Sequence, residues 1–256
     1  MKILFTGDIV GSAGRQIFQR ITARLRDEGR VDFVIANAEN AAGGRGPSPE
    51  IADAILAAGA NAITLGDHAW DDKTIISFIE TEPRIVRPAN FPPDAAGRGI
   101  TLIETPEGAL CIIALIGRVF MDPNDCPFRT ADKLIARAAA KTIIVDFHAE
   151  ATSEKIALGR YLDGRVTALL GTHTHVQTAD EIILPNGTAY ITDAGMTGAK
   201  DSVIGRDVAP VVQRFLTGMP QKFETSNLDP ALEGVILDVD MSTGKARTIE
   251  RIQERI

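Results

Sequence analysis

The chain begins with residues 1–40, MKILFTGDIVGSAGRQIFQRITARLRDEGRVDFVIANAEN, and this stretch decides the fold class. Residues 3–5 form a short apolar run that is typical of a buried strand. The segment that ends at Gly29 repeats apolar residues at helical spacing, namely Ile17, Ile21 and Leu25. A second apolar run follows at 33–36. Buried strands that alternate with amphipathic helices predict an α/β fold in which helices cover the sheet.

The same alternation continues along the chain. Ser48, Pro49 and Glu50 form a good helix start, and Gly59 provides a stop. Further helices are predicted around 75–79 and 131–140. Strands are predicted at 62–65, 101–104, 110–115, 142–146, 166–170, 189–192, 235–239 and 246–249. The two segments between 101 and 115 are candidates to begin a second sheet.

Length and composition limit the classes of function. The chain has 256 residues and is 45% hydrophobic, enough for a sizeable core, and with no repeat or linker we expect a single domain, 1–256. The net charge of -7 argues against a surface that holds long stretches of nucleic acid. A small anionic substrate would therefore need a local positive centre, which metal ions could supply.

The two cysteines and the first residues of the chain indicate the cellular compartment in which we expect the protein. Cys111 lies in an apolar run and Cys126 in a proline-flanked loop, which is neither a disulfide framework nor a zinc knuckle. The first apolar run is too short for a signal peptide or a membrane span. We therefore expect a cytoplasmic protein in a reduced compartment, without a membrane partner.

Polar residues that can bind metals follow five of the predicted strands. In open α/β sheets, ligands bind beyond the carboxyl ends of the strands, so these positions matter. They are Asp8 after the first strand, Glu39 and Asn40 after the second, Asp67 and His68 after the third, His148 after 142–146, and His173 with His175 after 166–170. All four histidines of the chain are among them.

Each of these residues alone has a structural explanation. Asp8 could cap a helix, Glu39 could be a solvated carboxylate, and a lone histidine is more often structural than a ligand. Independent loops have no reason to bring every histidine and several acids to one sheet edge. The group as a whole therefore indicates a metal or catalytic site.

The pair His173 and His175 is the most informative local feature. Side chains two residues apart in an extended chain point the same way, so both imidazoles can reach one pocket. Their spacing excludes the helical zinc-protease motif and implies an extended loop at a strand end. The mixed nitrogen and oxygen donors suit manganese, iron or zinc better than a thiolate site would.

The seven candidate ligands exceed what one tetrahedral ion needs. They are Asp8, Glu39, Asn40, Asp67, His148, His173 and His175. Two ions about 3.5 to 4 Å apart would use them, share Glu39 as a bridge and hold a hydroxide that attacks a phosphate. His68 is left over as a general acid.

Several stretches together resemble a known family. They are GDIVG at 7–11, AENAA at 38–42, GDHAWD at 66–71, RPANFP at 87–92, DFHAE at 146–150, GTHTHVQT at 171–178 and DAGMTG at 193–198. With them the chain resembles, nearly end to end, the YmdB-like metallophosphoesterases. These are bacterial 2',3'-cyclic-nucleotide 2'-phosphodiesterases of the calcineurin-like superfamily.

The resemblance implies a four-layer α/β/β/α sandwich of two mixed sheets flanked by helices. It also implies two divalent or trivalent metal ions, most often iron or manganese, with zinc and magnesium as alternatives. Asp8, Glu39, Asn40 and His175 would hold one ion, and Glu39, Asp67, His148 and His173 the other.

One position departs from the family pattern, which has Asn where this chain has Asp67. A carboxylate in place of the amide keeps the oxygen donor and adds negative charge. It should bind divalent ions more tightly and weaken their action on water and phosphate.

The expected reaction opens a 2',3'-cyclic nucleotide to a 3'-nucleotide, with His68 protonating the leaving 2' oxygen. The substrate would be a small phosphodiester, with an RNA-related substrate and a homo-oligomeric assembly also expected. Two alternatives stay open: a phosphoesterase of other specificity, and a regulatory member that binds RNA or protein and uses its metal site as a sensor with low turnover. For Lys200 and Arg206, a solvated role is more common than a phosphate contact.

Overall fold

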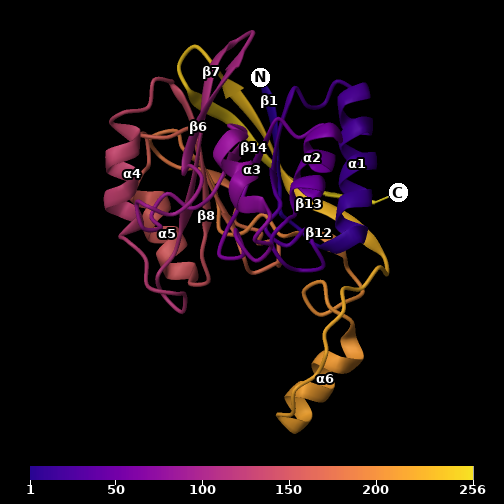
Figure 1. Cartoon of the computed structure of the whole chain (residues 1–256). Helices are drawn as coiled ribbons and strands as arrows, with labels where there is room; N and C mark the ends of the chain where they lie inside the picture. Colours follow the sequence, from indigo (N-terminus) through magenta and orange to yellow (C-terminus); the bar gives the residue numbers. More distant parts are fainter. Residues whose placement is uncertain (256) are drawn as a thin grey trace.

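Two β-sheets pack face to face in the computed structural model, which describes residues 1–255 (Figure 1). The first sheet contains β1 (Lys2–Thr6), β2 (Asp8–Ile9), β3 (Phe33–Asn37), β4 (Ala62–Thr64), β5 (Ile85–Val86), β12 (Met196–Ala199), β13 (Pro230–Asp240) and β14 (Lys245–Glu254). The second contains β6 (Ile100–Thr105), β7 (Gly108–Ile116), β8 (Thr142–His148), β9 (Ala168–Thr172), β10 (Ile182–Ile183) and β11 (Ala189–Ile191). The segments at 101–104 and 110–115 therefore do belong to a second sheet.

Both sheets are mixed, with a parallel core. The first has the order β2-β12-β13-β1-β3-β4-β5, with β14 beside β13, and the second has the order β10-β11-β9-β8-β7-β6. Strands β1, β3, β4 and β5 run parallel to one another, as do β7, β8, β9 and β11. Strand β13 lies antiparallel between β12 and β1. The carboxyl ends of each parallel set lie together and can present loops to one site.

Helices cover the outer face of each sheet (Figure 1). Helices α1 (Gly11–Asp27), α2 (Pro49–Ala57) and α3 (Ile75–Thr81) pack on the first sheet, and α4 (Pro127–Ile135) and α5 (Thr152–Tyr161) on the second. A separate apolar cluster fills the space between the sheets. These three clusters separate four layers, so the predicted α/β/β/α sandwich is confirmed.

Strand β1 shows how the sequence directs side chains into these layers. Ile3 and Phe5 join the cluster between the sheets, whereas Leu4 joins the cluster under the helices. Successive side chains of a strand point to opposite faces, so a strand covered on both sides is apolar at every position.

The start of α2 follows its capping residue. Ser48 accepts a hydrogen bond from the backbone N–H of Ile51 at 3.4 Å, and Pro49 occupies the first turn of α2, as predicted. Helix α4 begins at Pro127, four residues before the predicted start, because proline is favoured in a first turn. The sequence prediction did not include α5.

The glycines after β1 permit close packing of the backbone. A Cβ atom at Gly7 would collide with the carbonyl of Gly195, and one at Gly14 with the carbonyl of Thr197. These glycines therefore allow the approach of the segment around β12 to β2 and α1.

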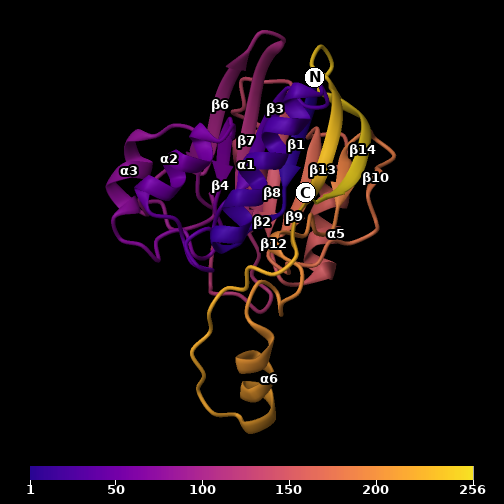
Figure 2. The ribbon, with the colours of Figure 1, turned by 90° about the vertical axis from the view of Figure 1, so that its right-hand side faces the viewer.

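Helix α6 (Val208–Thr217) projects away from the body of the molecule in both views (Figures 1 and 2). Among its own residues only Val211 is buried, and Phe215 and Leu216 are 84% and 76% exposed. Within residues 1–255, none of the helices combines the length and the apolar character that a membrane crossing requires.

Candidate active site

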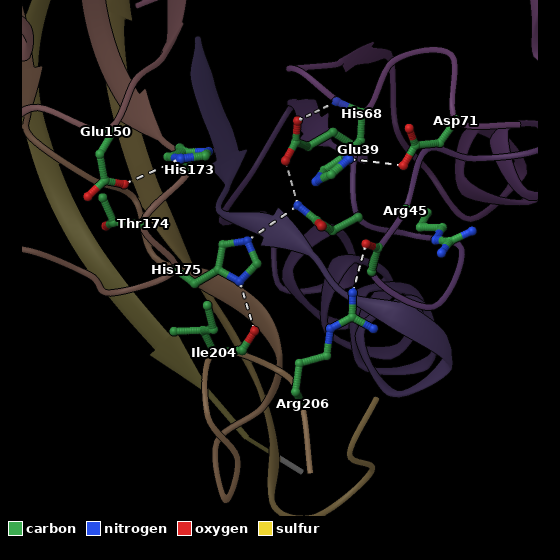
Figure 3. A pocket seen from close by; sticks show the side chains of 12 residues that line it. Glu39, Arg45, His68, Asp71, Glu150, His173, Thr174, His175, Ile204 and Arg206 are labelled. Carbon is green, nitrogen blue, oxygen red and sulfur yellow. Dashed lines mark hydrogen bonds and ion pairs between the residues drawn. The ribbon is translucent and has the colours of Figure 1, made fainter. Parts of the chain in front are cut away.

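The predicted site residues come together where the two sheets meet. After the parallel strands of the first sheet come Asp8, Glu39, Asn40, Asp67 and His68; from the second come His148, the last residue of β8, and His173 and His175 after β9. Side chains from both sheets face one cavity (Figure 3). The structure thus places these residues close together at the strand ends.

The loop that carries His173 and His175 is bent, not extended as expected. The backbone φ angles of these residues are 102° and 63°, in the left-handed region that is uncommon for residues other than glycine. The backbone N–H of His173 donates to Asp8 Oδ2 at 3.1 Å, and that of Thr174 donates to Asp193 Oδ2 at 3.1 Å. These contacts hold the bend and direct both imidazoles to the site.

Three ligand atoms converge on one nitrogen of His148. Its Nε2 lies 3.1 Å from Glu39 Oε2, 3.0 Å from Asp67 Oδ1 and 2.9 Å from His173 Nδ1. A ring nitrogen carries at most one proton and cannot satisfy all three neighbours. A cation bound among the four atoms would satisfy them together, so the geometry fits a metal ion.

A second group of ligand atoms includes Asp8, Glu39 and His175. Asp8 Oδ1 is buried and has no hydrogen-bond partner within residues 1–255. Asn40 donates to Glu39 Oε1 at 2.6 Å and lies 3.3 Å from His175 Nε2. A buried carboxylate oxygen without a partner is costly, and a bound cation would compensate it. Glu39 belongs to both groups.

The outward nitrogen of each clustered histidine lies next to an oxygen. The pairs are His148 Nδ1 with Thr172 Oγ1 at 2.9 Å, His173 Nε2 with Glu150 Oε2 at 3.3 Å, and His175 Nδ1 with the carbonyl of Ile204 at 3.0 Å. A proton held on the outward nitrogen leaves the inward nitrogen with a free lone pair. This is the arrangement of histidines that bind metals, whose outer N–H is anchored by a second residue.

A buried chain of hydrogen bonds fixes His148. The hydroxyl of Thr172 donates to Asp146 Oδ1 at 2.8 Å, so it can accept the Nδ1 proton of His148. Asn37 donates to the other oxygen of Asp146 at 3.0 Å. The chain connects β3, β8 and β9 and sets the ring orientation from behind.

A buried ion pair supports the bent loop. Lys155 Nζ lies 2.7 Å from Asp193 Oδ2, both side chains are fully buried, and Lys155 also donates to the carbonyl of Thr172 at 2.8 Å. The same carboxylate oxygen accepts from the backbone and hydroxyl of Thr174. The pair therefore joins α5 to the residue between the two histidines.

The site holds an excess of negative charge. Burial raises the pKa of Glu39, and the nearby charges of Asp8 and Asp67 raise it further, against the opposing charge of His148. Burial and the charge of His148 lower the pKa of His173 to about 4, which keeps this imidazole neutral at pH 7. Burial alone would lower the pKa of His148, but the charge of Glu39 and the hydrogen bonds with Asp67 and Glu39 raise it, and a divalent cation would displace the proton that this imidazole then carries.

His68 lies at the rim of the site and is half-buried. Its Nδ1 is 2.9 Å from Asp71 Oδ2. Asp67 Oδ1, on the preceding residue, faces the cluster, so His68 is close to the ligand atoms without being one of the converging groups.

The cavity over this cluster has a volume of about 740 Å³. Besides the clustered side chains, its lining contains Asp71, Glu150, Arg45 and Arg206. Lys200 instead pairs with Glu233 at 2.6 Å and does not line the cavity.

The sequence prediction missed several residues that surround the ligands. Asp71 and Glu150 lie within the stretches at 66–71 and 146–150, but nothing in the spacing indicated that they contact histidines. Lys155 and Asp193 were missed because lysine and aspartate side chains are mostly exposed in proteins.

The packed sheets and the histidine–carboxylate cluster at their strand ends define a metallophosphoesterase. Within that class, the chain belongs to the YmdB-like protein family, whose model matches residues 4–252. It is 50% identical over 254 residues to the 2',3'-cyclic-nucleotide 2'-phosphodiesterase of Bacillus subtilis (strain 168), across 98% of this chain and 96% of that protein.

Two solved structures are similar to this chain in both fold and sequence. A hypothetical protein from Thermus thermophilus superposes with a TM-score of 0.95 at 42% identity, across 100% of this chain and 99% of that one. A novel phosphatase from Mycoplasma pneumoniae has a TM-score of 0.95 at 37% identity, across 100% of this chain and 93% of that one.

Proposed function

We propose that this protein hydrolyses 2',3'-cyclic nucleotides to 3'-nucleotides with two metal ions. The observation that carries the proposal is the position of Glu39, whose carboxylate belongs to both groups of ligand atoms. One carboxylate shared by two groups is what a pair of adjacent ions requires. The substrate follows from the Bacillus subtilis relative, which is named for this reaction.

The ligand sets implied by the sequence resemblance agree with the two spatial groups. One ion would be held by Asp8, Glu39, Asn40 and His175, and the other by Glu39, Asp67, His148 and His173. Bound ions would supply an activated water and offset the charge of the phosphate. The mixed nitrogen and oxygen donors support iron or manganese, with zinc or magnesium as alternatives.

His68 is proposed to protonate the leaving 2' oxygen. Asp71 Oδ2 lies 2.9 Å from Nδ1 of His68, which leaves Nε2 to carry the proton that is transferred. Breaking the bond between phosphorus and the 2' oxygen leaves the phosphate on the 3' oxygen, and the proton from His68 completes the 2' hydroxyl.

The test is a panel of phosphodiesters and phosphomonoesters assayed with Mn²⁺ and with Fe²⁺. We expect 2',3'-cyclic AMP to be hydrolysed to 3'-AMP, which chromatography separates from 2'-AMP. Formation of 2'-AMP would contradict the role of His68 at the 2' oxygen. Hydrolysis of other esters alone would support a phosphoesterase of different specificity. No turnover together with tight binding of RNA or a protein would support a regulatory role.

Three further expectations belong to the proposal. We propose that residues 1–256 act as one domain, in the cytoplasm, and as a homo-oligomer. The apolar side chains exposed on α6 support the last point, since a helix of ten residues is marginal in water without packing. Light scattering on the native protein and on Phe215→Ser tests it, and a monomeric native protein would contradict it.

A further inference from the structure

Two arginines line the cavity beside the proposed metal site. Arg45 is exposed and Arg206 is partly buried. Neither forms an ion pair with a carboxylate within residues 1–255, although the chain carries a net charge of -7. The cavity acids Asp71 and Glu150 contact His68 and His173 instead. The arginines therefore form a local positive region in an acidic protein.

A tight loop places Arg45 next to the proposed ligand Asn40. The N–H of Gly44 donates to the carbonyl of Asn40 at 2.9 Å, and the N–H of Ala42 donates to the carbonyl of Arg45 at 3.0 Å. The guanidinium of Arg45 forms no hydrogen bond with any residue of the described chain 1–255. Its donors are free for a ligand.

The segment after β12 places Arg206 beside the same loop. The carbonyl of Ile204 accepts from His175, and a pair of backbone hydrogen bonds between Val203 and Arg206 closes the turn. Arg206 donates to the carbonyls of Gly43 and Gly44 at 2.7 and 3.0 Å. It thus joins the segment of His175 to the loop of Asn40.

The two guanidinium groups are close enough to influence each other. Burial lowers the pKa of Arg206, and the charge of Arg45 lowers it further. Figure 3 shows Arg45 on the side of the cavity that carries Asp71 and His68, opposite Glu150 and Thr174. Like charges held together without a counter-charge favour the binding of an anion between them.

We propose that Arg45 and Arg206 bind a second phosphate of the substrate, one that is not hydrolysed. This inference rests on the proposed function. Guanidinium groups bind phosphate with paired, charge-assisted hydrogen bonds, and they remain charged at any physiological pH. A cavity of about 740 Å³ is also larger than a cyclic phosphate needs, since sites for whole small molecules span roughly 300–1,000 Å³.

The second phosphate has two chemical sources. It is either the 5'-phosphate of a mononucleotide or the internucleotide phosphate of a short oligonucleotide that ends in a 2',3'-cyclic phosphate. The acidic character of the chain is consistent with a short ligand, because long nucleic acids require extended positive surfaces.

The experiment compares three substrates with the metal-loaded enzyme. They are 2',3'-cyclic AMP, its 5'-phosphorylated form, and diadenosine with an internucleotide phosphate and a terminal 2',3'-cyclic phosphate. The quantity measured is the ratio of kcat/KM for each two-phosphate substrate to kcat/KM for 2',3'-cyclic AMP. We expect about a tenfold preference for at least one of them, which is the size of one charge-assisted hydrogen bond.

Arg45→Gln is the main variant, because the guanidinium of Arg45 makes no hydrogen bond or ion pair within residues 1–255 whose loss would disturb the fold. We expect its preference ratio to fall close to one. Arg129→Gln removes another exposed arginine from α4, outside the cavity, and should keep the native ratio. The native preference should also weaken at high salt.

The outcomes separate this inference from the proposed function. Hydrolysis of all three substrates with a ratio near one, or with the same ratio in Arg45→Gln, overturns the inference and leaves the proposed function standing. Hydrolysis of none of them overturns both. Whichever two-phosphate substrate loses its preference in Arg45→Gln identifies the source of the second phosphate.

Discussion

The ring of His68 is joined to the carboxylate of Asp71 by a contact of 2.9 Å between Nδ1 and Oδ2. Its other nitrogen, Nε2, has no hydrogen-bond partner within residues 1–255. An imidazole that is anchored on one side and open on the other can deliver a proton without leaving its position. The open Nε2 therefore distinguishes His68 from the three histidines whose inward nitrogens meet the ligand cluster.

The first prediction concerns the role of His68. His68→Gln should keep its metal content and lose at least about tenfold in kcat on 2',3'-cyclic AMP, because general acid catalysis typically contributes 10² to 10⁴. The loss should be much smaller on bis-p-nitrophenyl phosphate, whose leaving group needs no proton. Equal losses on both substrates would mean that His68 does not act as an acid.

The second prediction concerns Asp67, a position at which the family resemblance leads us to expect Asn. Burial by itself would raise the pKa of Asp67, but the hydrogen bond and charge of His148 and the charges of His68 and His173 outweigh it and lower the pKa. Asp67→Asn should retain less metal when purified without added ions and turn over faster per bound ion. The metal content and the turnover rate are measured for both proteins. Identical values in the native protein and in Asp67→Asn would contradict the prediction.

The third prediction concerns the buried pair Lys155 and Asp193. Lys155→Met keeps the volume of the side chain but leaves Asp193 buried and unpaired, so the free energy of unfolding should fall by about 3–5 kcal/mol. Urea denaturation measures it, with the exposed Lys133→Met on α4 as a control. A second change, Asp193→Asn, should recover part of the loss, and equal stability of the Lys155 and Lys133 variants would contradict the prediction.

The fourth prediction concerns the removal of metal. Mn²⁺ added to chelator-treated protein should raise Tm, because a ligand at a hundred times its Kd stabilises the native state by about 2.7 kcal/mol. Asp8→Asn removes a carboxylate whose Oδ1 is buried without a partner, so its rise in Tm should be smaller. Calorimetry that shows the same Tm with and without Mn²⁺ would argue against the metal site.

The sequence predicted those parts of the site that depend on strand order. Asp8, Glu39 and His148 follow apolar runs whose period and composition are visible in one chain, and parallel strands end at the same edge. The bend at His173 and His175 could not be predicted in this way. It depends on Asp8 and Asp193, which are distant in sequence.

In the fold, too, features set by neighbouring residues could be predicted, whereas features set by residues distant in sequence could not. Ser48 and Pro49 mark the start of α2 through contacts within four residues, so the pattern is readable. The place of β13 between β12 and β1 depends on pairing across more than two hundred residues, from Lys2 to Asp238. Helix α6 was not predicted, and among its apolar side chains Phe215 and Leu216 stay exposed in the structure of residues 1–255.

Because β13 pairs with β1, the first sheet cannot be completed until β13 has been synthesised. Strand β1 leaves the ribosome early and pairs with β3 on one side, but its other edge has no partner until residues 230–240 are made. The backbone around Asp8 also depends on later segments, since its N–H donates to the carbonyl of Gly195 and the N–H of Gly7 donates to the carbonyl of Glu233. Because domains assemble as the chain emerges, the ligand cluster is completed only after residues 230–240 have been translated, and a nascent chain that ends before them carries the candidate ligands without yet having the site.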